Sequence, residues 1–216
     1  GMPPEEVEAA ILANPDAKAV LVNNPTYYGI CSDLRKIVEI VHRHGMKVLV
    51  DEAHGTHFYF GDGLPPSAMS CGADMASVSV HKTGGSLTQS AILLLGKGID
   101  PNYVRQIINL TQTTSASYLL MVSLDLARQN LALHGREFYA KTVEFADYAR
   151  KEINAIGGYY AFGEELCDGK AFYAFDKTKL SVHTRAMGLA GIEVYDLLRD
   201  EYDIQIEFGD IGNILA

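Results

Sequence analysis

Short continuous apolar runs alternate with segments of helical periodicity over the first hundred residues, and this alternation restricts the fold more than any other feature. Residues 18–24 (KAVLVNN) and 47–54 (KVLVDEAH) each have the pattern of a buried strand. The apolar side chains between these runs recur at helical spacing: Leu34, Ile37, Val38 and Val41. Strands of this kind, joined by helices, belong in a mostly parallel sheet with helices on both faces. We therefore predict an α/β fold.

The remaining elements of this region follow from the same signals. Residues 3–15 predict a helix, and the next helix is expected to start at an N-cap Ser32 and to stop at Gly45. A short helix is expected over 67–71. Strands are expected over 75–80 and 91–96, and the short link between them suggests an antiparallel pair.

Beyond residue 100 the pattern changes. Asp100-Pro101 marks a helix start, and a long helical stretch over 117–156 is expected to break near Gly135. Later segments predict a smaller α+β portion: strands over 170–176 and 204–208, and a helix around 194–199. We expect three parts: a partial large domain (1–115), connecting helices (116–160) and the start of a small α+β domain (161–216).

Composition excludes several classes of protein. A net charge of -9 and a pI near 5.2 argue against nucleic-acid binding, which needs clustered basic residues. The three cysteines (Cys31, Cys71 and Cys167) lack metal or disulfide spacing, which favours a reducing cytoplasm. No apolar run is long enough to cross a membrane, so we expect no membrane partner.

Polar residues that could take part in binding or catalysis follow shortly after the predicted strands. Asp51 and His54 follow one strand, His81 and Lys82 another, and Tyr27 lies shortly after the first. The carboxyl ends of parallel strands form the edge at which ligands bind. Each residue alone has an ordinary interpretation as a turn former, cap or solvated side chain. Their joint position predicts a site.

Two other interpretations of this segment are weaker. Residues 51–54 (DEAH) resemble a helicase box, but the chain has no G-x-x-x-x-G-K-[ST] loop to hold phosphates. A metal site built from Asp51, His54 and His57 is disfavoured, because these residues share no fixed face.

The segment from Ser77 to Ala91 (SVSVHKTGGSLTQSA) resembles the pyridoxal-phosphate attachment signature of the ornithine/lysine/arginine decarboxylase family along its whole length. Other blocks are similar to that family in the same order, namely residues 23–34, 48–58, 64–74 and 113–128. The resemblance implies a fold type I enzyme that decarboxylates lysine, ornithine or arginine. It also implies a homodimer or larger homo-oligomer with shared sites. Which of the three amino acids is the substrate stays open.

The resemblance also implies roles for individual residues. Lys82 would form a Schiff base with the aldehyde of pyridoxal 5'-phosphate, which needs a neutral amine, and burial beside the cofactor favours that form. Asp51 would pair with the protonated pyridine nitrogen. His81 is a further catalytic candidate. Further cofactor-binding candidates are Ala53, His54, Ser79, His81 and Ser115.

Three of these assignments carry alternatives. Ser79 and His81 have alternate spacing, so on an extended segment both would point to one side, toward the cofactor phosphate or the substrate carboxylate. Thr113, Ser115 and Ser117 either approach the phosphate from a neighbouring subunit or serve as a helix cap. His54 is either a ring-contacting residue or a structural histidine.

The resemblance begins inside the family's large domain, so we expect an incomplete site: the glycine-rich phosphate loop and the carboxyl-terminal domain of longer members are not represented. Exposed sheet edges invite a covering chain. The function that the resemblance implies is therefore decarboxylation of a basic amino acid, which we expect to be weak in this chain alone. The alternatives are a non-catalytic dimerising or partner-binding module, or another fold type I enzyme such as an aminotransferase or aldolase.

Overall fold

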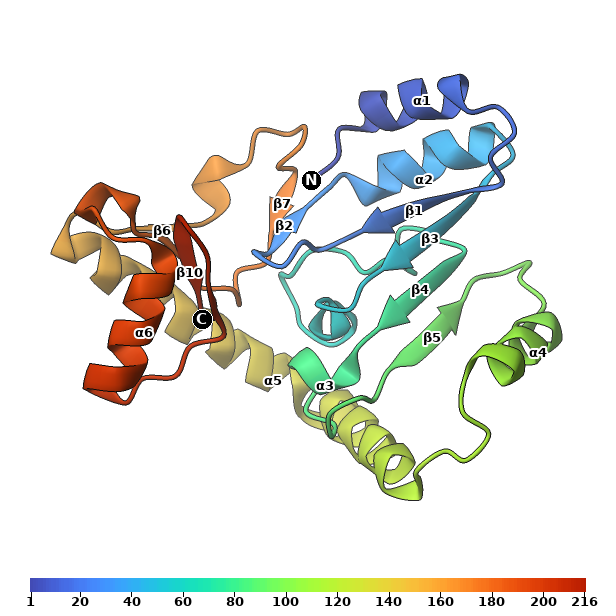
Figure 1. The fold of residues 1–216 in the computed structure, drawn as a ribbon. Helices are drawn as coiled ribbons and strands as arrows, with labels where there is room; N and C mark the ends of the chain where they lie inside the picture. The colour runs from blue at the N-terminus through green and yellow to red at the C-terminus, as the bar shows by residue number, and fades with distance from the viewer.

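The computed structural model describes all 216 residues and contains a four-stranded sheet that positions the site (Figure 1). Its strands lie in the order β1-β3-β4-β5. They span Ala19–Asn23, Lys47–Asp51, Met75–Val78 and Ile92–Leu95, respectively. β1, β3 and β4 are parallel, whereas β5 returns antiparallel to β4. The α/β class, the mostly parallel sheet and the antiparallel last pair are thus confirmed.

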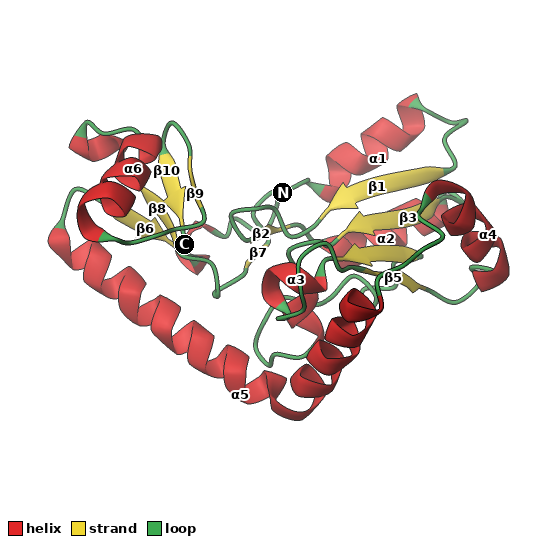
Figure 2. Ribbon diagram, turned by 60° about the horizontal axis from the view of Figure 1, so that its bottom comes forward, coloured by secondary structure: helices red, strands yellow, loops and turns green.

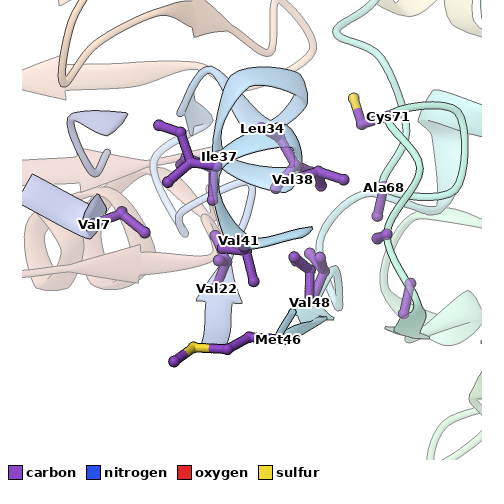
Figure 3. Packing of buried hydrophobic residues seen from close by; sticks show 14 of the residues in the cluster. Val7, Val22, Leu34, Ile37, Val38, Val41, Met46, Val48, Ala68 and Cys71 are labelled. Carbon is purple, nitrogen blue, oxygen red and sulfur yellow. The ribbon is translucent and has the colours of Figure 1, made fainter. Parts of the chain in front are cut away.

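Helices α1 (Pro4–Ala13) and α2 (Leu34–Arg43) cover one face of this sheet and enclose the main core. Figure 3 shows side chains of α2, among them Ile37 and Val41, packed toward Val22 of β1 and Val48 of β3. Because these side chains are almost wholly buried, the apolar periodicity of α2 fixes which of its faces meets the sheet. The core in turn holds the ends of β1 and β3 side by side.

Two local predictions in this region are wrong. The N-cap of α2 is Asp33 and not Ser32, because the Asp33 side chain accepts a hydrogen bond from the Lys36 backbone N–H. The Ser32 side chain instead accepts from the backbone N–H of Met2. The predicted helix over 67–71 is absent, and residues 68–72 form consecutive turns instead. Gly45, with φ +71°, does end α2 as predicted.

Two helices follow the sheet. Asp100 caps α4 (Pro101–Thr111) by accepting from the Asn102 backbone N–H, as predicted. Helix α5 (Tyr118–Ile156) continues through Gly135, so the predicted break is wrong, although Figure 2 shows that its axis bends. Gly135 serves close packing, because a Cβ there would lie 2.8 Å from Cβ of Phe60.

The remaining residues form a second, smaller unit. An antiparallel sheet has the strand order β6-β8-β10-β9 and packs against α6 (Gly191–Tyr202). Its strands span Tyr160–Phe162, Ser181–His183, Asn213–Leu215 and Phe208–Gly209, respectively. The helix is longer, and the strand near 204–208 shorter and later, than predicted. The predicted strand over 170–176 is reduced to β7 (Ala174–Phe175).

Strand β7 joins the two units. It pairs antiparallel with β2 (Ile30–Cys31), which lies between β1 and α2 in the chain. Short helical turns complete the structure: η1 (Thr56–Tyr59), α3 (Val80–Thr83), η2 (Glu164–Leu166) and η3 (Arg185–Met187). None of the helices combines the length and the apolar character needed to cross a lipid bilayer. The three-part domain division stays a prediction.

Candidate active site

Lys82 lies on α3, a single helical turn directly after β4. Gly84 ends this turn, and a Cβ there would come within 2.8 Å of the Val80 carbonyl oxygen and 2.9 Å of Thr56. Gly85 has φ +84°, a backbone conformation that favours glycine. The two glycines therefore let the chain turn sharply behind Lys82 and return as β5.

The amine of Lys82 meets His54, the residue that follows the end of β3. Lys82 Nζ lies 3.0 Å from Nε2 of His54. His54 is only 9% exposed. Burial, followed by the positive charges of Lys179 and Lys82, lowers its pKa to about 4. The imidazole is therefore neutral at neutral pH, and Nε2 accepts a hydrogen bond from the lysine, which can only donate when charged.

Lys82 itself is exposed. The burial that would favour a neutral amine is expected beside the bound cofactor, so that expectation stays a prediction. Lys82 also forms no ion pair with any carboxylate. Its position leaves the amine accessible for reaction with a bound group.

Asp51 lies at the same edge. Strand register places it beside Asn23 of β1 on one side and Ser77 of β4 on the other, so the three parallel strands end in one row. Its Oδ1 accepts a hydrogen bond from the Ala53 backbone N–H at 3.1 Å. The carboxylate forms no ion pair. His54 is influenced by the charges of both Asp51 and Lys82, so the fold brings these residues together.

Ser79 and His81 are arranged differently from the prediction. Ser79 is the N-cap residue of α3 and His81 lies within that helical turn, so the two do not share one side of an extended segment. His81 Nδ1 lies 2.9 Å from the carbonyl oxygen of Ser90, which only accepts, so Nδ1 carries the proton. This contact ties His81 to the returning chain. Its predicted catalytic role, and the cofactor-binding roles of both residues, stay predictions.

Ser115 lies in the exposed link between α4 and α5, apart from the Lys82 turn. Its backbone N–H donates to Thr113 Oγ1 at 3.2 Å. Ser117 occupies the N-cap position of α5 but makes no side-chain capping bond. The contribution of this link to a neighbouring subunit's site stays a prediction.

Three further residues lie near His54, and of these only Tyr27 was singled out from the sequence; Lys179 and Glu207 were not. The ring of Tyr27 packs edge-on against His54 with centroids 4.5 Å apart, and its hydroxyl donates to Glu207 Oε1 at 2.6 Å. Burial first, and then this carboxylate, raises the pKa of Tyr27 to about 12. Burial lowers the pKa of Lys179.

Tyr27 could be found because it follows a predicted strand. Lys179 and Glu207 lie far along the chain, and no local pattern connects them to residue 54. No three His, Cys, Asp or Glu side chains come together as a metal-binding cluster. The site thus combines two amines, carboxylates and a neutral imidazole.

Comparison with known proteins agrees with this chemistry. Residues 1–188 match the family model described as "Orn/Lys/Arg decarboxylase, major domain". The chain is 50% identical over 217 residues to an arginine decarboxylase of Halalkalibacterium halodurans and 46% identical to one of Bacillus subtilis. Each alignment covers 100% of this chain and 44% of the relative, so the chain spans less than half the length of these relatives.

Solved structures of similar fold are more distant in sequence. A Francisella novicida lysine decarboxylase has a TM-score of 0.81 at 19% identity, covering 100% of this chain and 36% of that one. An alanine–glyoxylate aminotransferase from Nostoc has a TM-score of 0.68 at 18% identity, covering 98% of this chain and 58% of the other. These likenesses confirm the predicted fold class. With 188 of its residues matched by the family model, the chain belongs to the Orn/Lys/Arg decarboxylase family.

Proposed function

We propose that this chain carries the reactive lysine of a pyridoxal-phosphate-dependent decarboxylase whose substrate is a basic amino acid, with arginine favoured by the names of its relatives. The observation that supports this most is the contact between Lys82 Nζ and neutral His54 at the carboxyl edge of the parallel strands. This edge is where α/β sheets bind ligands. The lysine is exposed and forms no ion pair, so its amine is accessible to a ligand.

The residues fit the proposed cofactor. Pyridoxal phosphate needs an amine that can bond its aldehyde carbon, a carboxylate for its pyridinium nitrogen and donors for its phosphate. Lys82 and Asp51 lie at the same edge, and both lack an ion-pair partner in the chain. Ser79, at the start of α3, is the candidate phosphate donor. When bound, the cofactor supplies a sink for the electron pair left behind by departing carbon dioxide.

Each of the chain's own residues has a defined task in this proposal. Lys82 would hold the cofactor through Nζ, and His54 Nε2 accepts a hydrogen bond from that amine. Asp51 keeps a proton on the ring nitrogen by stabilising its positive charge. The backbone N–H of Ala53 holds the Asp51 carboxylate in orientation.

The substrate's cationic side chain requires an acidic partner. Glu207 is the proposed partner, because it reaches the site through Tyr27, which packs on His54. A carboxylate pairs with a guanidinium through two parallel hydrogen bonds, which an ammonium cannot make. Arginine is therefore the preferred substrate in this proposal. We further propose that the protein is cytoplasmic and acts as a homodimer or larger homo-oligomer.

Cofactor attachment tests the proposal directly. The protein is incubated with pyridoxal phosphate, reduced with borohydride and digested, and mass spectrometry then locates the modified lysine. We expect modification at Lys82, with Lys47 and Lys97 as internal control lysines. Release of carbon dioxide from arginine, lysine and ornithine is then compared in the complete gene product, and arginine is expected to react fastest. Attachment without preference for Lys82 would contradict the proposal and favour a non-catalytic module.

A further inference from the structure

A buried histidine and a buried aspartate lie directly behind the Lys82 turn, and nothing described so far uses them. His57 belongs to η1 and Asp176 follows β7, and both are 0% exposed. His57 Nε2 lies 2.8 Å from Asp176 Oδ2. The two residues are 119 positions apart, so this contact connects the second unit of the chain to the sheet that carries the site.

The charge of Asp176 orients His57. Burial raises the pKa of Asp176, but hydrogen bonds from His57 and Thr178 outweigh it and hold that pKa below its usual range. The Thr178 hydroxyl donates to Oδ1 at 2.7 Å. His57 is the only ion-pair partner of this carboxylate. A buried carboxylate must be satisfied, so Nε2 of His57 is the nitrogen that donates to it.

The other nitrogen of His57 reaches the Lys82 turn. Nδ1 lies 3.2 Å from Oγ1 of Thr83, the residue that follows Lys82. The Tyr139 hydroxyl, from α5, donates to the Thr83 carbonyl oxygen at 2.7 Å. Thr83 is therefore held through both its side chain and its backbone. Because α3 is only one turn long, holding Thr83 limits the directions in which Lys82 can point.

We infer that His57 and Asp176 are positioning residues, which act through Thr83 to aim the amine of Lys82 at His54 and the cofactor. The inference rests on the proposed role of Lys82. A fixed direction raises reactivity, because a small misplacement of a reacting group slows its reaction strongly. If the pair only joined the two units, its loss would lower stability but leave the geometry of the folded Lys82 turn unchanged.

The chain contains a matched control. His42 Nε2 also lies 2.8 Å from an aspartate, Asp74 Oδ2, at the opposite end of the sheet and away from Lys82. His42→Gln therefore removes a histidine–aspartate contact of the same length without touching the site. Thr83→Val removes the hydroxyl that contacts His57, whereas Thr83→Ser keeps it.

The first readout needs no cofactor. NMR titration of the His54 imidazole reports on Lys82, since burial and then the charges of Lys179 and Lys82 depress the pKa of His54. If Lys82 turns away, that pKa rises. We expect His57→Gln and Thr83→Val to raise it by about half a unit. Thr83→Ser and His42→Gln should leave it at the wild-type value.

The second readout is the rate at which pyridoxal phosphate attaches to Lys82, fixed by borohydride and counted by mass spectrometry. We expect the attachment rate to decrease about tenfold in His57→Gln and Thr83→Val and to stay at the wild-type value in Thr83→Ser. Where His57→Gln does not fold, Thr83→Val carries the test. The inference is overturned if Thr83→Val matches His42→Gln in both readouts. If the wild-type protein itself shows no attachment, the proposed function fails, and the His54 titration still decides the inference.

Discussion

The two ends of the parallel strands carry the same three kinds of charged or titratable residue and treat them in opposite ways. At the amino end, Asp74 is buried and accepts from Lys47 Nζ at 2.9 Å, His42 Nε2 at 2.8 Å and the Val48 backbone N–H at 2.8 Å. Burial raises the pKa of Asp74, but these hydrogen bonds outweigh it and lower that pKa overall. The charges of Asp74 and Lys47 are thus paired with each other within the chain.

At the carboxyl end, the aspartate and the lysine have no such partner. Asp51 accepts only from its own turn, and Lys82 donates only to the neutral His54. Charges that are left unpaired beside one another are available to a ligand, whereas charges that satisfy one another hold the fold together. The difference between the two ends supports our proposal that the carboxyl-end residues bind the ligand, even though the residue types at the two ends are nearly the same.

The largest expected difference between the ends concerns their lysines. Lys82→Ala should remove cofactor attachment and lower decarboxylase activity by about a thousandfold or more, because no other amine lies on the Lys82 turn. Lys47→Ala should leave activity unchanged, because Lys47 pairs with a structural aspartate. Carbon dioxide release and borohydride fixation measure both variants. A Lys82→Ala protein that keeps either property would remove the basis of the comparison.

The two aspartates should give opposite results. Asp51→Asn should lower activity by about a hundredfold with little change in unfolding free energy, since it is a half-buried residue with one local hydrogen bond. Asp74→Asn should lower the unfolding free energy by about 2 kcal/mol, because a buried acceptor of three hydrogen bonds loses its charge.

Urea denaturation and activity assays on the same samples separate these effects. Loss of turnover in Asp51→Asn and loss of stability in Asp74→Asn would support the different roles of the two ends. Loss of turnover in Asp74→Asn at full stability would contradict them, since the amino end would then also serve the reaction.

The sequence was sufficient for the sheet and for one part of the site. Continuous apolar runs mark β1, β3 and β4, and residues directly after such strands must gather at one edge, so Asp51, His54 and Lys82 were found together. Such apolar runs can be recognised from a few neighbouring residues, so the strands and their ends are predictable from local sequence.

The rest depends on long-range contacts that no local pattern encodes. Tyr27 meets Glu207 across 180 positions, and His57 meets Asp176 across 119. The extended segment expected at Ser79 was wrong because β4 ends at Val78 and the chain coils into α3. Likewise, Gly135 indicated a helix break from its intrinsic propensity, whereas its lack of a Cβ makes room for Phe60.

In the wild-type protein the smallest expected effect is that of pH, and the groups that produce it also differ between the two ends. Burial raises the pKa of Glu52 to about 7 from 4.5, although hydrogen bonds from Tyr59 and Ala68 oppose that shift. His54, two residues later, has its pKa lowered to about 4 from 6.5. Asp74, at the amino end, has its pKa lowered from 3.8, so its protonation affects stability only at a lower pH than this window. Between pH 5 and 7 only the carboxyl end should change stability.

The two groups at that end act in opposite directions. His54 has a lowered folded pKa, so its contribution to stability is present above pH 6.5 and is lost as the pH falls toward 4. Glu52 has a raised folded pKa, so its contribution is present below pH 4.5 and is lost as the pH rises through 7. The wild-type protein should therefore show a nearly flat unfolding free energy across this window, because the two trends nearly cancel.

Single variants should uncover each trend. His54→Gln should lose about 2 kcal/mol of unfolding free energy between pH 5 and pH 7, and Glu52→Gln should gain about as much. Urea unfolding at pH 5, 6 and 7 measures the slope, which is independent of any uniform destabilisation by the substitution. If the unfolding free energy changed with pH in the same direction in both variants, His54 would not be held neutral at the site. The hydrogen bond that it accepts from Lys82 would then lose its physical basis.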